Sequence, residues 1–401
     1  MTEPLDFLPI SGLRLASAAT GIRYPGRDDL VLLEMAPGSS CAAVFTRNAF
    51  CAAPVRLARA HLAETPPRYL LINSGNANAG TGSSGLQAAE ESCRILAEAA
   101  ACPIEAVLPF STGVIGEPLP LAPFRRGIPQ LLADLNERHW PQAARAIMTT
   151  DTRPKLVSRQ REIGGQSVRL TGMAKGSGMI QPNMATLLAY LATDAALAPE
   201  LLQQALQEAI EPSFNSISVD GDTSTNDACV LVATGRSGLS IDDLDTEAGQ
   251  ALRSLLLEVC MELAEAIVRD GEGATKLIPI QVSGARSVEE ARQVGFTIAH
   301  SPLVKTAMFA SDPNWGRILA AVGRSGIPQL QVEGVRIWLG DVLIVEQGGR
   351  AASYREELGQ AVMNRTDIPV RIELGRGEAE ARILTCDLSF DYVKINAEYR
   401  S

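Results

Sequence analysis

The segment from Lys175 to Leu188 gathers residue types that could do chemistry. It reads Lys-Gly-Ser-Gly-Met-Ile-Gln-Pro-Asn-Met-Ala-Thr-Leu-Leu, so Thr186 stands at the entrance to an apolar run, behind a loop of Gly, Ser, Pro and Asn. A cut before Thr186 makes this residue N-terminal, and it then carries a hydroxyl nucleophile and a free amine base together. The segment therefore makes Thr186 a candidate nucleophile.

A second hydroxyl candidate follows the apolar run Val107–Phe110. Thr112 and Gly113 stand at the end of this expected strand, where a hydroxyl and a backbone N–H can point at one atom. Those are the donors that an oxyanion hole needs. An ordinary turn explains the same residues, and local sequence alone favours the turn.

Several charged or polar side chains could bind a substrate. Lys175 precedes two glycines and could neutralise a carboxylate as a point charge, and Glu272 stands between two glycines. Thr149 and Thr150 close an expected helix, where hydroxyls either bind a ligand or satisfy terminal carbonyls. A surface lysine, a solvated loop and a helix end are the alternative interpretations.

Other catalytic classes find little support in the sequence. GxSxG and GxxxxGK[ST] are absent, which argues against serine hydrolases and P-loop nucleotide binding. The three histidines, His61, His139 and His300, are isolated, and structural or surface roles are expected for them. Seven scattered cysteines without a CxxC pair indicate buried thiols in a reducing compartment, and no metal site is expected.

Composition sets the remaining bounds. The 401 residues are 46% hydrophobic, enough for two or three domains, and the net charge of −10 disfavours nucleic acid and anionic membranes. The N-terminus lacks a basic region followed by an apolar core, so a soluble cytoplasmic protein is the default expectation.

Strand-like and helix-like patterns alternate along the chain. They predict an α/β or α+β fold with mixed or antiparallel sheets. The C-terminal segment 394–401 is expected to pack against the protein. The expected strands are 68–73, 167–172, 186–191, 276–283 and 370–384, with a hairpin in 329–345. The expected helical segments are 86–100, 130–148, 199–210, 288–294 and 302–310, with a long helix within 239–269, and Pro141 is expected to mark a helix start within 130–148.

Seven segments, in order, resemble the ornithine acetyltransferase family, also called the bifunctional arginine-biosynthesis glutamate N-acetyltransferases. The resemblance covers essentially the whole chain, and the segment with Met184-Ala185-Thr186 is its most specific part. The matching segments are 73–79, 111–116, 149–152, 175–187, 270–276, 311–317 and 395–397.

The resemblance implies an α+β, N-terminal-nucleophile-like fold: two β layers flanked by helices, with a smaller additional region in the C-terminal half. It also implies self-cleavage between Ala185 and Thr186. The resulting α chain 1–185 and β chain 186–401 are expected to form one interwoven catalytic unit, assembled as α2β2.

Roles carry over residue by residue. Thr186 matches the nucleophile, and Thr112 and Gly113 match the oxyanion hole. One of Thr149 and Thr150 matches a substrate contact, with Thr150 favoured. The remaining substrate-binding positions match Lys175, Thr186, Glu272, Asn396 and Ser401, where the last keeps the hydroxyl of a position that is often Thr in the family.

The activity implied by the resemblance is acetyl transfer from N2-acetyl-L-ornithine to L-glutamate through an acetyl-Thr186 intermediate, in arginine biosynthesis. No cofactor is expected, and acetyl-CoA is a second donor if the enzyme is bifunctional. Two alternatives stay open: a self-processing aminopeptidase or amidase that passes the acyl group to water, and an uncleaved, non-catalytic binding protein. The acceptor and the intact mass distinguish them.

Overall fold

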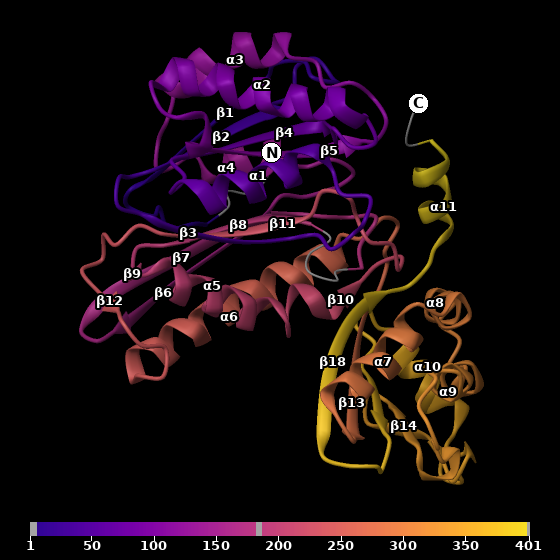
Figure 1. Cartoon of the computed structure of the whole chain (residues 1–401). Coiled ribbons are helices and arrows are strands. Elements are labelled where there is room, and N and C mark those ends of the chain that lie inside the picture. Colours follow the sequence, from indigo (N-terminus) through magenta and orange to yellow (C-terminus); the bar gives the residue numbers. More distant parts are fainter. Residues whose placement is uncertain (1–5, 182–186, 399–401) are drawn as a thin grey trace. The chain divides into compact units, whose positions relative to one another are not determined.

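The computed structural model describes residues 6–181 and 187–398, and the chain forms two compact units (Figure 1). The first unit comprises Met1–Gly176, Pro182–Asn215 and Thr223–Ile267. The second comprises Ser177–Gln181, Ser216–Asp222 and Val268–Ser401. Each unit has its own sheets and its own hydrophobic core.

The first unit contains a four-stranded sheet in the order β1-β2-β4-β5. Neighbouring strands are antiparallel except β4 and β5, which are parallel. Helices α2 and α3 cover one face, because their apolar sides share a core with side chains of β1, β2 and β4. The elements are β1 (Leu13–Ala18), β2 (Leu30–Met35), β4 (Tyr69–Asn76), β5 (Val107–Val114), α2 (Gly82–Ala100) and α3 (Ala122–Ala133).

A five-stranded sheet in the order β3-β11-β8-β7-β6 forms the second layer of this unit. Only β8 and β11 are parallel, and every residue of both is buried, as expected for strands covered on both faces. Its strands are β3 (Ser40–Phe45), β6 (Lys155–Ile163), β7 (Gln166–Lys175), β8 (Leu188–Thr193) and β11 (Ala228–Ala233); β9 (Ala196–Leu197) and β12 (Ser240–Ile241) form a separate pair.

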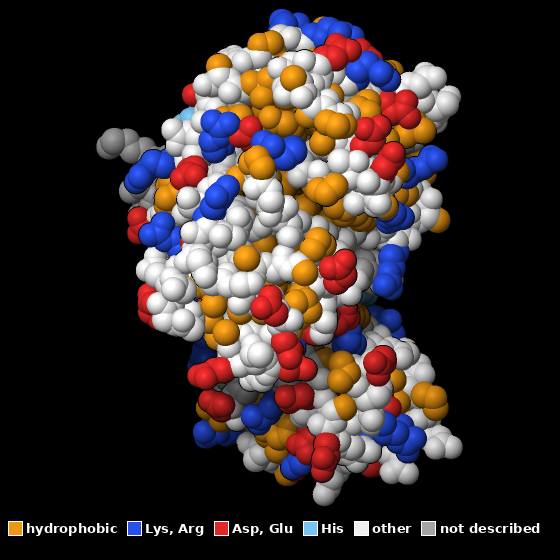
Figure 2. Space-filling view, turned by 60° about the vertical axis from the view of Figure 1, so that its left-hand side comes forward, with side chains coloured by type: hydrophobic (Ala, Val, Ile, Leu, Met, Phe, Trp, Pro, Cys, Tyr) orange, Lys and Arg blue, Asp and Glu red, His pale blue; other side chains and the backbone are white. Residues whose placement is uncertain are grey.

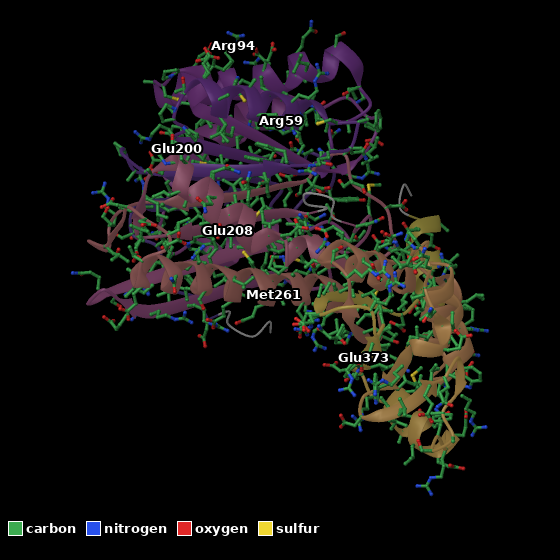
Figure 3. The ribbon with its side chains drawn as sticks, turned by 60° about the horizontal axis from the view of Figure 1, so that its bottom comes forward. Arg59, Arg94, Glu200, Glu208, Met261 and Glu373 are labelled. Atoms are coloured by element: carbon green, nitrogen blue, oxygen red, sulfur yellow. The ribbon has the colours of Figure 1, made fainter. Side chains whose placement is uncertain are left out.

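The two sheets pack face to face. Phe110 of β5 and Tyr190 of β8 meet edge to face, with ring centroids 5.4 Å apart, in the core that both sheets share. Helices α5 and α6 cover the outer face of the five-stranded sheet, where α5 carries Glu208 and α6 carries Met261 (Figure 3). This arrangement confirms the expected layered sandwich. The helices are α1 (Ala53–Glu64), α4 (Trp140–Ala146), α5 (Pro199–Ile210) and α6 (Glu247–Arg269).

The second unit is built on a seven-stranded mixed sheet in the order β10-β18-β13-β17-β14-β15-β16. Helix α7 packs closely on β18, since a Cβ on Gly295 would lie 2.6 Å from Ile383. The elements are β10 (Ile217–Ser218), β13 (Leu277–Ala285), β14 (Arg336–Leu339), β15 (Val342–Glu346), β16 (Gly349–Arg350), β17 (Val370–Glu373), β18 (Ala379–Cys386), α7 (Val288–Ala299), α8 (Pro302–Phe309), α9 (Trp315–Gly323), α10 (Glu356–Met363) and α11 (Phe390–Ala397).

The predicted helical segment 130–148 divides into two helices: α3 ends at Ala133 and α4 begins at Trp140. Pro141 lies in the first turn of α4, where the missing N–H costs nothing, so the helix start predicted at Pro141 is confirmed. The C-terminal segment contacts the second unit without being buried: α11 buries none of its side chains, and Phe390 and Val393 are exposed, but Asn396 Nδ2 donates to Glu272 Oε2.

The surface agrees with the charge balance of the sequence. On the face shown in Figure 2, Lys and Arg side chains lie among Asp and Glu side chains rather than in one basic area. Within residues 6–181 and 187–398, no helix combines the length and the apolar composition that a membrane span requires.

Candidate active site

Thr112 and Gly113 lie inside β5, so the turn interpretation is wrong for them. The pairing of β5 with β4 becomes irregular at Gly75 and Asn76, directly beside these residues. Gly113 has φ of 133°, and a Cβ there would lie 2.6 Å from the backbone nitrogen of Asn76. Only glycine fits this backbone approach, which explains the Thr-Gly pair at the strand end.

Lys175 reaches Thr112 from the other sheet. It is the last residue of β7, its side chain is buried, and its Nζ donates to Oγ1 of Thr112 at 3.3 Å. Two residues singled out separately in the sequence are thereby brought into contact across the sandwich. A cation and a hydroxyl donor at one point suit a site where negative charge develops.

Asp151 organises the surroundings of Lys175, although no role of its own is predicted for it from the sequence. Its carboxylate accepts from Lys155 Nζ at 2.6 Å, from Gly176 N at 2.9 Å and from Thr149 N at 3.0 Å. Burial alone raises the pKa of this carboxyl, but the ammonium groups of Lys175 and Lys155 outweigh it and hold the pKa well below its usual range. Asp151 is thus an ionised hub that ties the end of β7 to the loop after α4.

Thr149 and Thr150 lie in that loop, next to Asp151. Both residues are half-buried, and the backbone of Thr149 is fixed by the Asp151 carboxylate. Which of the two hydroxyls meets a substrate stays a prediction.

In the second unit, Glu272 and Asn396 come together from distant parts of the sequence. Asn396 Nδ2 donates to Glu272 Oε2 at 2.7 Å, and Glu272 N donates to Ser177 O at 2.9 Å. A Cβ on Gly178 would lie 2.5 Å from Oε1 of Glu272. The carboxylate therefore lies directly on the Gly178 backbone, which gives the Gly-Ser-Gly loop a steric function.

Asp220 supports the same loop. It accepts backbone hydrogen bonds from Met179 at 2.6 Å and Ile180 at 2.8 Å, and the Tyr392 hydroxyl lies 3.4 Å away. Burial raises the pKa of the Asp220 carboxyl, and the backbone hydrogen bonds only partly offset this rise. Met179 has φ of 56°, so the carboxylate holds a backbone turn that a side chain disfavours.

Three predicted site residues fall outside the described residues: Ala185, Thr186 and Ser401. Their roles stay predictions. Among residues 6–181 and 187–398, no group of three His, Cys, Asp or Glu side chains has a metal-binding arrangement. His61 is buried, with Nδ1 2.8 Å from Val107 O, and the seven cysteines are free thiols.

Comparison with known proteins decides the family. The sequence model of the ArgJ family matches residues 14–401. The chain belongs to the ArgJ family. It is 59% identical over 98% of its length to the arginine biosynthesis bifunctional protein ArgJ of Methylococcus capsulatus, and the match spans 96% of that relative.

Two solved structures are also similar to this ArgJ-family chain. The crystal structure of arginine biosynthesis bifunctional protein argJ from Bacillus halodurans is 38% identical, with a TM-score of 0.49, over 51% of this chain and 96% of that one. An ornithine acetyltransferase from Mycobacterium tuberculosis, crystallised with ornithine, is 32% identical, with a TM-score of 0.39, over 45% of this chain and 93% of that one. Membership of the ArgJ family confirms the resemblance and the expectation of an acyltransferase enzyme of arginine biosynthesis.

Proposed function

We propose that this ArgJ-family chain transfers the acetyl group of N2-acetyl-L-ornithine to L-glutamate, through an acetyl ester on Thr186, after self-cleavage between Ala185 and Thr186. The observation that carries the proposal is the buried contact of Lys175 Nζ with Thr112 Oγ1, beside the glycine-only position 113. This arrangement supplies hydrogen-bond donors of the kind that a tetrahedral acyl intermediate requires.

The first half-reaction uses the two functions of an N-terminal threonine. Thr186 Oγ attacks the acetamide carbonyl, and the Thr186 α-amine takes the hydroxyl proton. A free α-amine has a pKa of about 7.7–8.0, close to working pH. The Thr112 hydroxyl and the Gly113 N–H stabilise the oxyanion, Lys175 adds positive charge, and ornithine leaves with the transferred proton.

The second half-reaction runs the same steps in reverse order on a new amine. The glutamate amino group attacks the acetyl ester, the oxyanion forms again, and Thr186 Oγ leaves as N-acetylglutamate is released. Thr149 or Thr150, Lys175, Glu272, Asn396 and Ser401 are proposed as substrate contacts.

The rest of the proposal follows from the resemblance. The products of cleavage, 1–185 and 186–401, stay associated and assemble as α2β2 in the cytoplasm. The ornithine–glutamate exchange requires no cofactor and no metal. Acetyl-CoA serves as a second donor if the enzyme is bifunctional. The name of the Methylococcus capsulatus relative calls that protein bifunctional.

Initial-rate kinetics test the transfer. Rates measured with acetylornithine and glutamate should give parallel double-reciprocal lines, because the acetyl group leaves the first substrate before the second binds. Acetyl-CoA in place of acetylornithine shows whether a second donor is used. Intersecting lines count against the covalent route, and free acetate without acetylglutamate indicates a hydrolase.

Intact mass tests the cleavage. The purified protein should contain two chains, and Thr186→Ala should remain a single inactive chain of 42.6 kDa. Two fragments from Thr186→Ala would contradict the assignment of the nucleophile.

A further inference from the structure

Asp220 is not among the proposed substrate contacts, yet it holds the loop beside them. It is half-buried in the second unit, after β10. Its carboxylate accepts from the backbone N–H groups of Met179 and Ile180, and Asp222 N donates to its Oδ1 at 3.2 Å. A carboxylate that accepts three backbone N–H groups fixes the local backbone, because moving the backbone would leave those donors unpaired.

One oxygen of Asp220 also reaches the C-terminal helix. Oδ2 accepts from Met179 N at 2.6 Å and from the Tyr392 hydroxyl of α11 at 3.4 Å. Burial raises the pKa of Tyr392, and the carboxylates of Asp220 and Glu272 raise it further, so the hydroxyl keeps its proton and acts as the donor. The loop and the helix therefore meet at one carboxylate oxygen.

The helix continues this connection to Glu272. Asn396 lies one turn after Tyr392 on α11, and its Nδ2 donates both to Tyr392 O at 3.0 Å and to Glu272 Oε2 at 2.7 Å. Glu272 N in turn donates to Ser177 O at 2.9 Å, and Ser177 begins the loop that Asp220 holds. Hydrogen bonds and short stretches of backbone thus form a closed hydrogen-bonded ring that starts and ends at Asp220 Oδ2.

Helix α11 depends on such contacts for its position. Among its described residues no side chain is buried, and eight residues are too few for a helix to be stable by itself. Contacts at its start come from Ser389, whose Oγ donates to Gly273 O at 2.6 Å, and from Phe390, which meets Phe309 edge to face. Asn396 lies near the opposite end, so the hydrogen-bonded ring determines where it stands relative to Glu272.

We propose that Asp220 is a positioning residue for substrate binding, which sets the spacing of Glu272 and Asn396 without touching the substrate. The inference rests on the proposed function, in which these two side chains are substrate contacts. Binding sites work when such side chains are held within about 0.5 Å of the productive geometry by the groups behind them. Asp220 acts on both contacts at once, because the loop under Glu272 and the helix that carries Asn396 share its Oδ2.

Kinetics of the cleaved enzyme test this role, with rates referred to the amount of cleaved chain measured by intact mass. Asp220→Asn keeps the size of the side chain but leaves one acceptor oxygen for the N–H groups of Met179 and Ile180. KM for acetylornithine should rise about tenfold, with a smaller change in kcat. Asp194→Asn is the matched control in the first unit, since Asp194 is a buried carboxylate that accepts Arg169 N at 2.8 Å. Its KM should equal that of the wild type.

A double-mutant cycle separates positioning from general damage. If Asp220 acts through Asn396, adding Asp220→Asn to Asn396→Ala should raise KM by about twofold at most, because effects within one network are not additive. Tyr392→Phe opens the hydrogen-bonded ring at its longest contact and keeps Asp220. Its KM should rise about threefold with unchanged kcat, and its unfolding in urea should resemble that of the wild type, so it decides the question if Asp220→Asn does not fold.

The outcomes separate this inference from the function on which it rests. A wild-type KM in Asp220→Asn or in Tyr392→Phe would overturn the inference. So would an Asp220→Asn effect on KM that multiplies in full with that of Asn396→Ala. An unchanged KM in both Glu272→Gln and Asn396→Ala would instead contradict the proposed substrate contacts themselves, and the inference with them.

Discussion

The carboxylate of Asp151 and the ammonium group of Lys155 form an ion pair of 2.6 Å whose two side chains are almost completely shielded from solvent. Two backbone N–H groups also donate to the carboxylate, one from the residue after β7 and one from the loop after α4. The pair therefore joins the segments that carry Lys175 and the two candidate threonines.

Breaking this pair should destabilise the protein strongly. Asp151→Asn leaves the Lys155 charge buried without its counter-ion, and the free energy of unfolding should fall by about 3–5 kcal/mol, measured with urea. Asp134→Asn, at a mostly exposed carboxylate of the same unit, should change it little. If Asp151→Asn lowers the free energy of unfolding no more than Asp134→Asn does, the ion pair does not hold the loop.

The pair also gives a pH dependence with a definite sign. The pKa of Asp151 is depressed in the folded state, so its stabilisation is present above the ordinary carboxyl pKa and is lost as pH falls toward the depressed value. Acidification should therefore destabilise the wild type more than Asp151→Asn. If acidification lowers the free energy of unfolding equally in both proteins, Asp151 is not ionised in the folded wild type.

Gly178→Ala should act on Glu272 without touching any charge. The added methyl group meets the Glu272 carboxylate, which must move away from Asn396. If Glu272 binds substrate, KM should rise about tenfold or more with a smaller change in kcat. Gly323→Ala, at the end of α9 with open space around its Cα, is the control and should leave KM unchanged. An unchanged KM in Gly178→Ala would remove Glu272 from the substrate contacts.

Thr112→Val tests the oxyanion hole. It replaces the hydroxyl by a methyl group of similar size, so kcat/KM should fall by about 10²–10³. Thr112→Ser restores the hydroxyl and should recover most of the activity. Arg94→Gln removes a charge from the exposed side of α2 and controls for general electrostatics (Figure 3). Full activity in Thr112→Val would place the oxyanion donors elsewhere.

The sequence predicts best where local spacing determines the element. Helix α5 agrees residue for residue with the expected 199–210, because proline starts it and its apolar spacing is regular. Strands β1 and β3 are not among the predicted strands, since each is only six residues long and neither keeps an apolar–polar alternation over its whole length.

The site shows the same division between local and long-range information. Family motifs point to Thr112 and Lys175, and the fold brings the two into contact. Asp151 gains significance only from its burial and from the groups that the fold places around it, including Gly176 directly after β7. The signal available in the sequence was an acid among three threonines, which does not reveal which charges lie nearby.

His300 makes the second unit sensitive to acid. Its Nε2 lies 3.0 Å from Ser218 Oγ, and burial, helped by Lys305 and Arg324, lowers its pKa to about 4. An unfolded histidine titrates near 6.5, so between pH 6.5 and 4 the unfolded chain binds more protons than the folded one. Stability should therefore fall as pH drops through this range, by on the order of 1–2 kcal/mol once solvent screening is allowed for.

His300→Gln keeps a polar partner for Ser218 but cannot take up the proton. Unfolding measured between pH 7 and 4.5 should show a smaller acid-dependent loss in His300→Gln than in the wild type. His139→Gln serves as the control, because His139 lies at the start of α4 in the other unit and its imidazole is paired with Asp134 at 3.7 Å. If the free energy of unfolding depends on pH in the same way in His300→Gln and the wild type, protonation of His300 does not destabilise the folded protein.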